Sequence, residues 1–377
     1  MKGKQNKDTK WLTGFWMLLL GVYHIPFVVV SYYHRDARGH SDAHTYWSVY
    51  KDISERSWFS FLDFSTDFIL FLNYYPIKLG LPFWFGFLVY GCIGYLGYYY
   101  FLKFTLIVFK DSSKKYLTPI IILVALWPSL HYWTATLGKE PIVFLSLSYI
   151  FWATVSTNRS LLKMGIAFLF LAFIRPHVAL FLLTAYAIVG LFYFKTTLKR
   201  KSLFTVCALL VGGFLVHQVL QIARIKRLDW ERIKRFNDFS LSSFSSSGSY
   251  VPMESYTLFY KMFSFYFRPL ASDVKSLVQF FAAVENYVLL SLHVVALGML
   301  LLYFHKLKKL RLSFMWWVSF IFMLICGVIY IWRYANLGIF MRTKIMYAPF
   351  WTVSLLYLII LLLPQSTNVI RKQHEGN

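Results

Sequence analysis

Hydrophobic residues along this chain gather in long runs that are separated by shorter polar segments. A run of about 20 apolar residues lets a helix cross a hydrocarbon core of about 30 Å, and a helix satisfies its own backbone polar groups in lipid. The alternating pattern that a membrane β-barrel requires is absent from the sequence. The pattern therefore predicts an all-α polytopic membrane protein with about ten transmembrane helices, at residues 11–33, 82–109, 117–133, 142–157, 164–174, 178–194, 203–222, 276–302, 313–332 and 345–363.

Two long segments outside these helices hold most of the remaining sequence. In the first outer loop, at residues 34–81, Tyr46, Val49, Tyr50 and Ile53 recur at helical spacing. This spacing predicts an amphipathic helix that lies in the membrane interface. An aromatic stretch then leads the chain back towards the bilayer.

The second outer loop, at residues 223–275, is more polar than the first. It opens with a basic run at 224–235 and becomes serine-rich at 240–249, where few apolar residues remain to be buried. We expect this part to be mobile, either as a lid over a charged site or as a plain tether. With these two loops, residues 1–377 are predicted to form a single transmembrane domain.

Basic residues in the short loops predict the orientation of the chain. An even number of spans places both termini on one face, whose acidic residues are only Asp8, Asp111 and Glu375 among many lysines and arginines. We expect that face to be cytoplasmic and the protein to lie in the cytoplasmic (inner) membrane. The other face mixes cations with most of the acidic residues, which topology does not require.

The net charge of +23 belongs to a chain that is 58% hydrophobic and only 15% charged. Topology and attraction to anionic lipid headgroups account for much of this charge, so it does not indicate a nucleic acid partner. The cations on the outer face suit an anionic ligand that is itself held at the membrane. Membrane lipids are therefore the partners that composition predicts.

Neither the cysteines nor the histidines are spaced as metal ligands. Cys92, Cys207 and Cys326 all fall within predicted spans, so no disulfide framework is expected. The histidines near the outer face match no metal motif. We expect no cofactor; a divalent metal is chemically possible at such a site, but the spacing does not support one.

Several cationic side chains are predicted where spans meet the outer face, beside proline or glycine turns. Guanidinium groups match phosphate oxygens, so cations from separate loops can grip a phosphate or pyrophosphate. The alternative for each residue is a snorkelling side chain that anchors a helix end. The predicted residues for phosphate and lipid-carrier binding are Lys139, Arg175, His177, Arg268, Arg333 and Arg342.

Three acidic residues are candidates for catalysis. Asp36 and Asp42 follow the first span, where partial desolvation can raise the pKa of a carboxyl group towards that of a general base. Alternatively, Asp42 caps a helix and Asp36 is a solvated loop residue. Glu285 lies within the eighth span, where a carboxylate usually faces a cavity or a partner. Its alternative role is an ion pair with Lys103 or with an outer arginine.

The layout of these segments resembles that of polytopic bacterial glycosyltransferases of the C-type (GT-C) fold. In that fold the first span is likewise followed by a long outer loop with interfacial helices and an acidic residue. The other segments that carry the resemblance are similar to those of oligosaccharide-repeat polymerases of exopolysaccharide and O-antigen synthesis; they are Trp127–Glu140, Ile174–His177, Phe267–Pro269 with Glu285 and Asn286, and Asn336–Arg342. The first loop lacks the adjacent Asp-Glu pair of the metal-assisted members.

The resemblance implies transfer of a sugar from a polyprenyl-phosphate or polyprenyl-pyrophosphate carrier on the outer leaflet to a glycan or lipid-linked acceptor. An outer carboxylate would deprotonate the acceptor hydroxyl, and the cations would stabilise the leaving phosphate. The resemblance further implies that Trp133, His131 and Glu140 contact the sugar. Aromatic residues in this segment also fit an ordinary interfacial belt.

A transporter or flippase for lipid-linked oligosaccharides is the main alternative, and a non-catalytic assembly protein is another. Transporters often carry internal repeats, broken helices and charges at mid-membrane. Here the charges gather at one surface, and only Lys103 and Glu285 are predicted inside spans. The distribution of charge therefore favours an enzyme that acts at the membrane surface.

Overall fold

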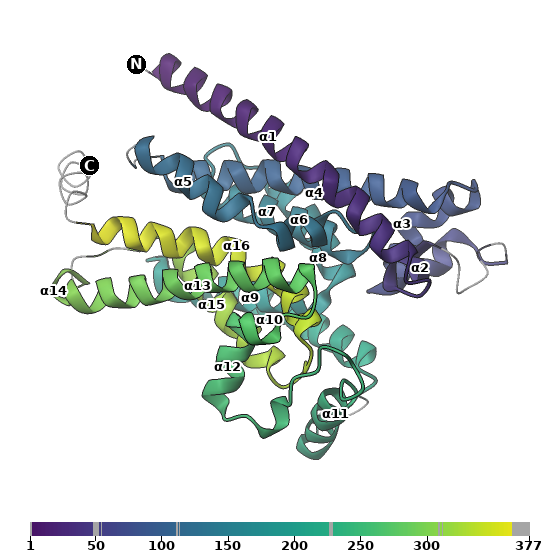
Figure 1. Cartoon of the computed structure of the whole chain (residues 1–377). Coiled ribbons are helices and arrows are strands. Elements are labelled where there is room, and N and C mark those ends of the chain that lie inside the picture. The colour runs from purple at the N-terminus through teal and green to yellow at the C-terminus, as the bar shows by residue number, and fades with distance from the viewer. Residues whose placement is uncertain are drawn as a thin grey trace. The chain divides into compact units, whose positions relative to one another are not determined.

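The chain folds almost entirely into α-helices, as its hydrophobic pattern predicts (Figure 1). This computed structural model describes residues 2–47, 53, 55–110, 112, 114–225, 229–307, 310 and 312–363. Within these residues, β-type pairing is limited to an isolated bridge between Tyr250 and Asn336. The helices are α1 (Lys2–Asp36), α2 (Asp42–Trp47), η1 (Trp58–Phe61), α3 (Thr66–Lys78), α4 (Phe83–Val108), α5 (Lys114–Ala125), α6 (Pro128–Thr134), α7 (Lys139–Val155), α8 (Leu161–Ile174), α9 (Pro176–Tyr193), α10 (Leu198–Ile222), α11 (Trp230–Ser242), η2 (Met253–Ser255), α12 (Leu258–Phe267), η3 (Ala271–Asp273), α13 (Leu277–Leu302), α14 (Phe304–Leu307), α15 (Phe314–Tyr330) and α16 (Leu337–Leu362), where η marks a 3-10 helix.

Each predicted span falls on a helix or a helix pair, but fewer helices are long and apolar enough to cross a membrane. Among the described residues, six meet both conditions: α1 from Trp11 onward, α4, α9, α10, α13 and α16. α5 and α6 make a seventh if this pair, bent by 52°, counts as one broken span. α8 and α15 are apolar but shorter. The protein is thus a helical membrane protein, whereas the number of ten spans stays a prediction.

The bend between α5 and α6 has a local cause in Pro128. Proline fits the first position of a helix and disfavours helical backbone in the residue before it. Pro128 opens α6, and Trp127 before it is extended, with φ −72° and ψ 118°. The segment predicted as one span over 117–133 is therefore two helices.

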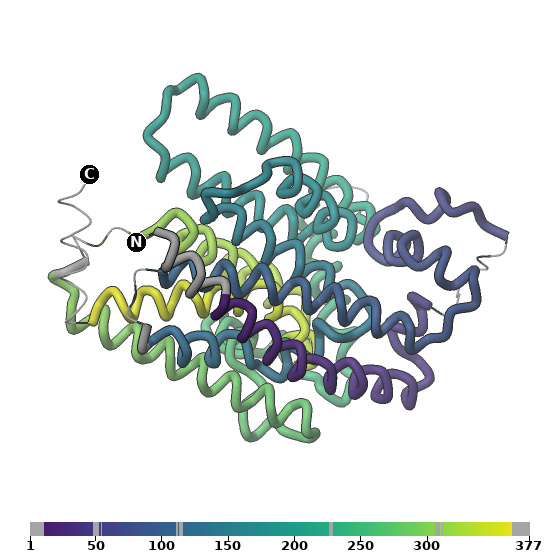
Figure 2. Tube along the Cα trace, turned by 90° about the horizontal axis from the view of Figure 1, so that it is seen from above, coloured from purple at the N-terminus to yellow at the C-terminus, as the bar shows by residue number. Residues whose placement is uncertain are grey.

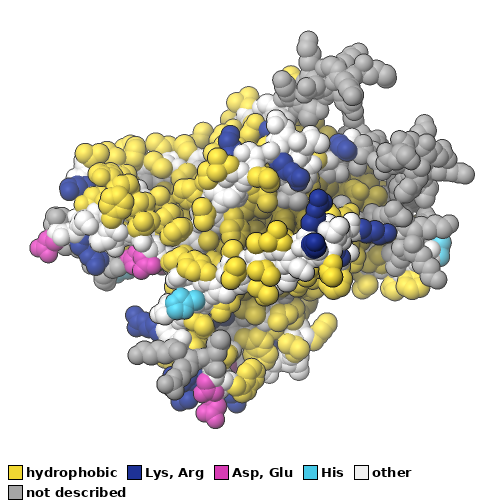
Figure 3. Space-filling view, turned by 180° about the vertical axis from the view of Figure 1, so that it is seen from behind, with side chains coloured by type: hydrophobic (Ala, Val, Ile, Leu, Met, Phe, Trp, Pro, Cys, Tyr) yellow, Lys and Arg dark blue, Asp and Glu magenta, His cyan; other side chains and the backbone are white. Residues whose placement is uncertain are grey.

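Large apolar side chains cover much of the protein surface (Figure 3). α10 is the extreme case: only 6% of its most apolar stretch is buried, and Leu203, Leu209 and Leu210 are 67%, 69% and 70% exposed. Soluble proteins rarely expose continuous patches of this kind. This surface is typical of helices that contact lipid, which agrees with the length and hydropathy of the spans.

The helices form two compact units, and each is described by itself. Unit 1 comprises Met1–Ile107 with Ala125–Leu180, and unit 2 comprises Val108–Val124 with Phe181–Asn377. In unit 1, α6 packs on α1, α7 and α8 form a hairpin, and α2, η1 and α3 pack together. α1, with 35 residues, runs as one unbroken helix (Figure 2). In unit 2, α16 packs against both α13 and α15, and α12 contacts all three.

Glycines on α4 let neighbouring helices of unit 1 approach its backbone closely. A Cβ atom on Gly94 would lie 2.0 Å from the backbone oxygen of Thr134 in α6. A Cβ atom on Gly91 would lie 2.6 Å from a methyl group of Val28 in α1. Because a backbone oxygen cannot rotate aside as a side chain can, the contact at Gly94 is the less tolerant of the two.

Replacing Gly94 with alanine should lower the free energy of unfolding by about 1–3 kcal/mol, the usual cost of overpacking. Thermal unfolding of the purified protein in detergent would measure this change. The control is Gly165→Ala in α8, where the added Cβ meets nothing within 4 Å and alanine favours helix by up to about 1 kcal/mol. Equal stability of the two variants would contradict the close approach of α4 and α6.

The first outer loop contains a shorter second helix than its periodicity predicts. α2 is only six residues long and buries Tyr46. Of the other positions in the predicted amphipathic helix, Val49 and Tyr50 lie outside the described residues, and Ile53 packs in a cluster with η1 and α3. The interfacial position of this segment stays a prediction.

The serine-rich segment of the second outer loop contacts the residues that precede α16. The Val251 N–H donates to the Ala335 carbonyl at 2.9 Å, and Nδ2 of Asn336 donates to the Ser247 hydroxyl at 2.8 Å. These bonds satisfy polar groups that a poorly packed loop would leave to water. The predicted mobility and the lid role of residues 240–249 are not tested by these contacts and stay predictions.

Candidate functional site

The residues that the sequence predicts for a site divide between the two units. Unit 1 holds eight of them, namely Asp36, Asp42, His131, Trp133, Lys139, Glu140, Arg175 and His177. Unit 2 holds the other four, namely Arg268, Glu285, Arg333 and Arg342. The two sets are therefore two separate constellations, and each has its own chemistry.

The centre of the unit 1 set is a buried ion pair. Glu140 lies in the first turn of α7, and Arg175 follows the last residue of α8, directly before Pro176 opens α9. Arg175 donates a hydrogen bond to the Glu140 carboxylate, and their side chains are 12% and 1% exposed. The two segments meet as expected, but the charge of Arg175 is balanced within the protein.

The side chain of Lys139, the residue before Glu140, contacts residues of the first outer loop. Its Nζ donates to the hydroxyls of Ser65 at 2.7 Å and Thr66 at 3.2 Å. It also lies 5.8 Å from the centre of the Tyr46 ring on α2. We define Lys139, Glu140 and Arg175 as the α7 cluster, because all three gather where α7 begins.

The C-terminal end of α1 contacts α6 within the same unit. Nδ1 of His34 hydrogen-bonds with the Tyr132 hydroxyl, and the Arg35 guanidinium lies 5.3 Å from the centre of the Trp133 ring. The Nε atom of Arg35 is buried and has no hydrogen-bond partner among the described residues. The end of α1 is therefore held against the aromatic side chains of Tyr132 and Trp133.

Both candidate bases of unit 1 have exposed side chains. Asp36 is the last residue of α1, and Asp42 is the first residue of α2. Ser41 therefore precedes α2 at the cap position that the sequence offered to Asp42, and its hydroxyl pairs with Nδ1 of His44 at 2.9 Å. Both residues lie at the surface of unit 1.

The three residues expected to contact a sugar are all buried. His131, Glu140 and Trp133 are 0%, 1% and 9% exposed. Glu140 is engaged with Arg175, and His131 contacts His24 of α1. Sugar contact by these side chains stays a prediction, as does phosphate binding by His177, which is half-buried in the first turn of α9.

A largely apolar groove of about 490 Å³ runs along unit 1 between α3, α4, α7 and α8. On α4 its lining spans residues 89–100, which is about 16 Å of helix at 1.5 Å per residue. Ile142 lines one end, one turn along α7 from Lys139, and Lys163 at the start of α8 lines the other. The groove thus begins beside the α7 cluster and follows the helices.

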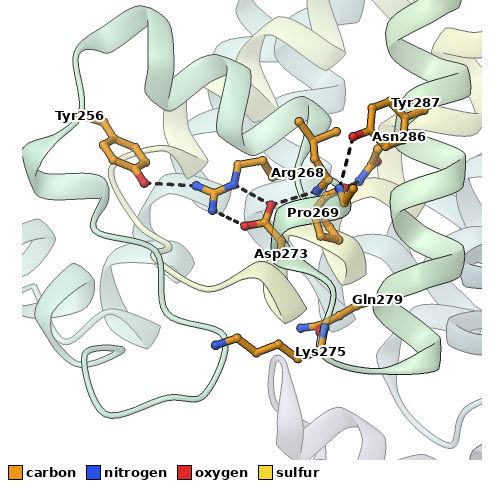
Figure 4. A network of polar contacts seen from close by, with 10 residues as sticks. Tyr256, Arg268, Pro269, Asp273, Lys275, Gln279, Asn286 and Tyr287 are labelled. Atoms are coloured by element: carbon orange, nitrogen blue, oxygen red, sulfur yellow. Dashed lines mark hydrogen bonds and ion pairs between the residues drawn. The ribbon is translucent and has the colours of Figure 1, made fainter.

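In unit 2, Arg268 is engaged by an acidic partner that the sequence pattern does not single out (Figure 4). Its Nε donates to Oδ2 of Asp273 at 2.9 Å, its Nη2 donates to Oδ1 of Asp273, and its Nη1 donates to the Tyr256 hydroxyl at 3.2 Å. The hydrogen bond with Asp273 raises the pKa of Arg268. Burial alone would raise the pKa of Asp273, but hydrogen bonds from Arg268 and from the Leu270 N–H outweigh it and hold that pKa below its usual value.

Replacing Asp273 with asparagine should lower the free energy of unfolding by about 1.5–3 kcal/mol at neutral pH, the usual value of hydrogen bonds to a charged group. Because the folded pKa of Asp273 is depressed, its contribution is present above the unfolded pKa of about 3.9 and is lost as the pH falls through the folded value. Thermal unfolding between neutral and acid pH would show this. The Asp273→Asn variant should lack that part of the acid destabilisation.

An exposed ion pair supplies the control for this experiment. Glu231 and Arg235 form an i,i+4 pair on α11 whose side chains are 80% and 73% exposed. Such pairs contribute about 0–1 kcal/mol. Glu231→Gln should therefore change stability little, and an equally small effect of Asp273→Asn would contradict a structural role for the Arg268–Asp273 pair.

A second buried network of unit 2 surrounds Lys344 of α16. Its Nζ donates to Oδ1 of Asn286 at 2.5 Å and to the Arg268 backbone oxygen at 2.8 Å, and Nδ2 of Asn286 donates to the Pro269 oxygen at 2.8 Å. Glu285 beside it is 7% exposed and interacts electrostatically with Lys344. Lys344, a lysine of the same unit, therefore helps to balance the charge of the Glu285 carboxylate within the span.

The remaining two cations of unit 2 are placed differently from each other. Arg333 follows α15, lies 4.2 Å from the centre of the Phe236 ring and donates to the Ser240 hydroxyl. Arg342 is half-buried inside α16, because this helix begins at Leu337 and not at the predicted residue 345. Neither lies in a free loop, and phosphate binding by either stays a prediction.

Metal ligation finds no support among the described residues. Within them, no group of three or more His, Cys, Asp or Glu side chains is arranged to hold a metal ion. Cys92, Cys207 and Cys326 are free thiols, and the last is buried.

Chemically, unit 1 combines exposed carboxylates with an apolar groove that begins beside the α7 cluster. In unit 2, Arg268 pairs with Asp273, and Lys344 interacts electrostatically with Glu285. Comparisons of the chain with protein-family models, with curated proteins and with solved structures found no match.

Proposed function

We propose that this protein is a membrane glycosyltransferase that uses a polyprenyl-phosphate- or polyprenyl-pyrophosphate-linked sugar in cell-surface polysaccharide synthesis. The observation that carries the proposal is the groove of unit 1, which begins beside the α7 cluster. A polyprenyl carrier has an anionic head and a long apolar tail. The apolar groove suits the tail, and the α7 cluster beside its end suits the head.

The groove has the size and lining of a ligand site for a hydrocarbon chain. Its volume lies within the range of about 300–1,000 Å³ that is common for ligand pockets, which are mostly apolar. At its head lies Lys139, whose Nζ donates to the hydroxyls of Ser65 and Thr66. A phosphate there would gain a charge-assisted hydrogen bond.

The proposed reaction needs one base and one stabilising cation. The carboxylate of Asp42 or Asp36 takes the proton of an acceptor hydroxyl, whose oxygen attacks the anomeric carbon of the donor sugar. The bond from this carbon to the carrier phosphate breaks, and the phosphate leaves with the electron pair. Lys139 stabilises that charge. Arg175, which pairs with Glu140, is the second cation of the α7 cluster. We place the reaction at the outer face of the cytoplasmic membrane with both termini inside, on the distribution of basic residues.

The proposal is tested with purified protein in nanodiscs, using donors that carry the same sugar on a long or a short polyprenyl chain. We expect sugar transfer that depends on the long chain and falls by about 10²–10⁴-fold in Asp42→Asn or Asp36→Asn, the usual loss without a general base. Asp63→Asn, which changes an exposed acid of the same loop, is the control and should transfer normally. Full turnover by both the Asp36 and the Asp42 variants would refute the assignment of the base.

The groove itself is tested by filling it. Ala167 lines the groove from α8, so Ala167→Leu should weaken use of the long-chain donor. Gly165→Leu on the same helix serves as the control, because a Cβ atom added at Gly165 meets nothing within 4 Å. If deletion of the gene leaves the surface glycans unchanged in length and composition, the protein is not this transferase.

A transporter or flippase of lipid-linked oligosaccharides remains the second candidate, and one observation favours it. Buried polar side chains lie within the spans of both units, with His24 in unit 1 and Glu285 and Lys344 in unit 2. Transporters often place such groups at mid-membrane. Vesicles that contain the protein would move a labelled lipid-linked sugar between leaflets without consuming it, whereas the transferase would convert it into product.

A further inference from the structure

Two histidines of unit 1 pair inside the protein, and the proposed transfer uses neither. His24 lies near the middle of the span that begins at Trp11 in α1, and His131 lies on α6. They are 3% and 0% exposed. Their Nδ1 atoms are 2.9 Å apart, which is hydrogen-bond distance, so one of these two atoms must donate to the other.

The other nitrogen of each ring faces a backbone oxygen. Nε2 of His24 lies 3.2 Å from the Gly91 oxygen, and Nε2 of His131 lies 2.8 Å from the Ala125 oxygen. A carbonyl oxygen only accepts, so each Nε2 must carry a hydrogen to make its bond. A neutral imidazole carries one N–H. Two neutral rings that both donate from Nε2 would face each other with two lone pairs.

The three contacts therefore need three hydrogens, and two neutral histidines supply only two. We propose that His24 and His131 together bind one additional proton, shared between their Nδ1 atoms. The proton comes from water, and the pair becomes one imidazole and one imidazolium. All four ring nitrogens are then satisfied, which no arrangement of the neutral pair achieves.

One contact of the histidine pair favours a positive charge on it, whereas the burial of the pair opposes that charge. The ring of Tyr98 on α4 stacks on His131 at 4.2 Å between centres and 12° between planes, and a π face attracts a cation. The other titratable side chains that face the pair are Tyr23 of α1 and Tyr95 of α4. α6 and the end of α5 present backbone groups to the rings, and His24 itself acts electrostatically on His131.

His293 in unit 2 is a histidine whose contacts need no additional proton. Its Nδ1 donates to the Leu289 oxygen at 2.7 Å, and its Nε2 accepts from the Trp351 indole at 2.8 Å. One neutral tautomer satisfies both contacts. His293 is also in a helix that spans the membrane, so it is a matched internal comparison for the pair.

The bound proton joins α1 to α6 and thereby to the surface of unit 1. Tyr132 and Trp133, the residues after His131, contact His34 and Arg35 at the end of α1. Loss of the proton would leave one of the three contacts of the pair without a hydrogen and loosen this packing. The pair is thus a proton-binding site whose occupancy affects α1, and this inference does not depend on the proposed transfer.

Nuclear magnetic resonance of the protein with ¹⁵N-labelled histidine, in nanodiscs, tests the proposal between about pH 8 and pH 5, where histidine charge usually changes. We expect a ¹⁵N–¹⁵N coupling across the Nδ1–H–Nδ1 bond and three ring-bound hydrogens on the pair at the acid end. His293 should keep one hydrogen throughout. Two neutral rings with only two ring-bound hydrogens over the whole range, with or without that coupling, would overturn the proposal.

Variants assign the signal to the pair. His24→Gln and His131→Gln should each abolish the coupling, because glutamine does not titrate, whereas His293→Gln should leave it unchanged. The number of ring-bound hydrogens on the wild-type pair, read together with the coupling, decides the question even if a variant of the pair fails to fold. A coupling that survives both variants of the pair would refute the assignment.

Discussion

Replacing Glu140 with glutamine should lower the free energy of unfolding by about 3–5 kcal/mol, the usual cost of removing one partner from a buried ion pair. Glutamine keeps the shape of the side chain but not its charge. The guanidinium of Arg175, with only 12% of its side chain exposed, would then be buried without a counter-charge. Unfolding of the purified protein by heat or denaturant in detergent would measure the loss.

The double variant separates the ion pair from the packing around it. Replacing both partners of a buried pair with apolar residues is often close to neutral, so Glu140→Met with Arg175→Met should be more stable than either single variant. Glu231→Gln, in the exposed pair on α11, is the reference for a weak ion pair. A loss at Glu140 no larger than at Glu231 would mean that the pair contributes little.

Replacing Lys344 with methionine should cost a similar amount, about 3–5 kcal/mol, because the change removes the charge of Lys344 from beside the buried carboxylate of Glu285. Lys344 is 8% exposed and Glu285 is 7% exposed. Methionine fills the same space but cannot donate to Asn286 or to the Arg268 oxygen. The loss would be measured as for Glu140.

A second substitution provides the internal check. Adding Glu285→Gln to Lys344→Met removes the buried negative charge that Lys344 acts on and should restore part of the stability. Lys275→Met, which changes an exposed lysine just before α13, is the control and should have little effect. If Glu285→Gln worsens Lys344→Met by its full separate cost, the two residues are not coupled.

The positions of the helices could be predicted because each apolar run is long and continuous. The ends were less predictable, because capping residues and prolines set them. Asn336 caps α16 by accepting from the Ile339 N–H at 3.2 Å, and asparagine is a favoured cap. Reading that signal would have started the helix at Leu337 and placed Lys344 two turns inside it.

The pairing of side chains could not be predicted from the sequence. Glu140 and Arg175 were both singled out, yet their separation of 35 residues says nothing about contact. His24 was not distinguished from the apolar residues of its run, and its partner His131 was assigned to the surface. Partners of this kind depend on how helices pack, which hydrophobic periodicity does not specify.

The break between α5 and α6 bears on the order in which the chain can be assembled in a membrane. The break leaves carbonyl oxygens of Ala125 and Leu126 for side chains to satisfy, and the oxygen of Leu126 accepts from the Tyr23 hydroxyl on α1 at 3.4 Å. In hydrocarbon an unsatisfied oxygen costs several kcal/mol. Because α1 is synthesised first, its tyrosine is already in the bilayer when the broken helix arrives. In a circularly permuted chain that places α1 at its C-terminal end, the break between α5 and α6 would enter the bilayer before Tyr23 is present. We expect such a chain to be degraded more often during biogenesis.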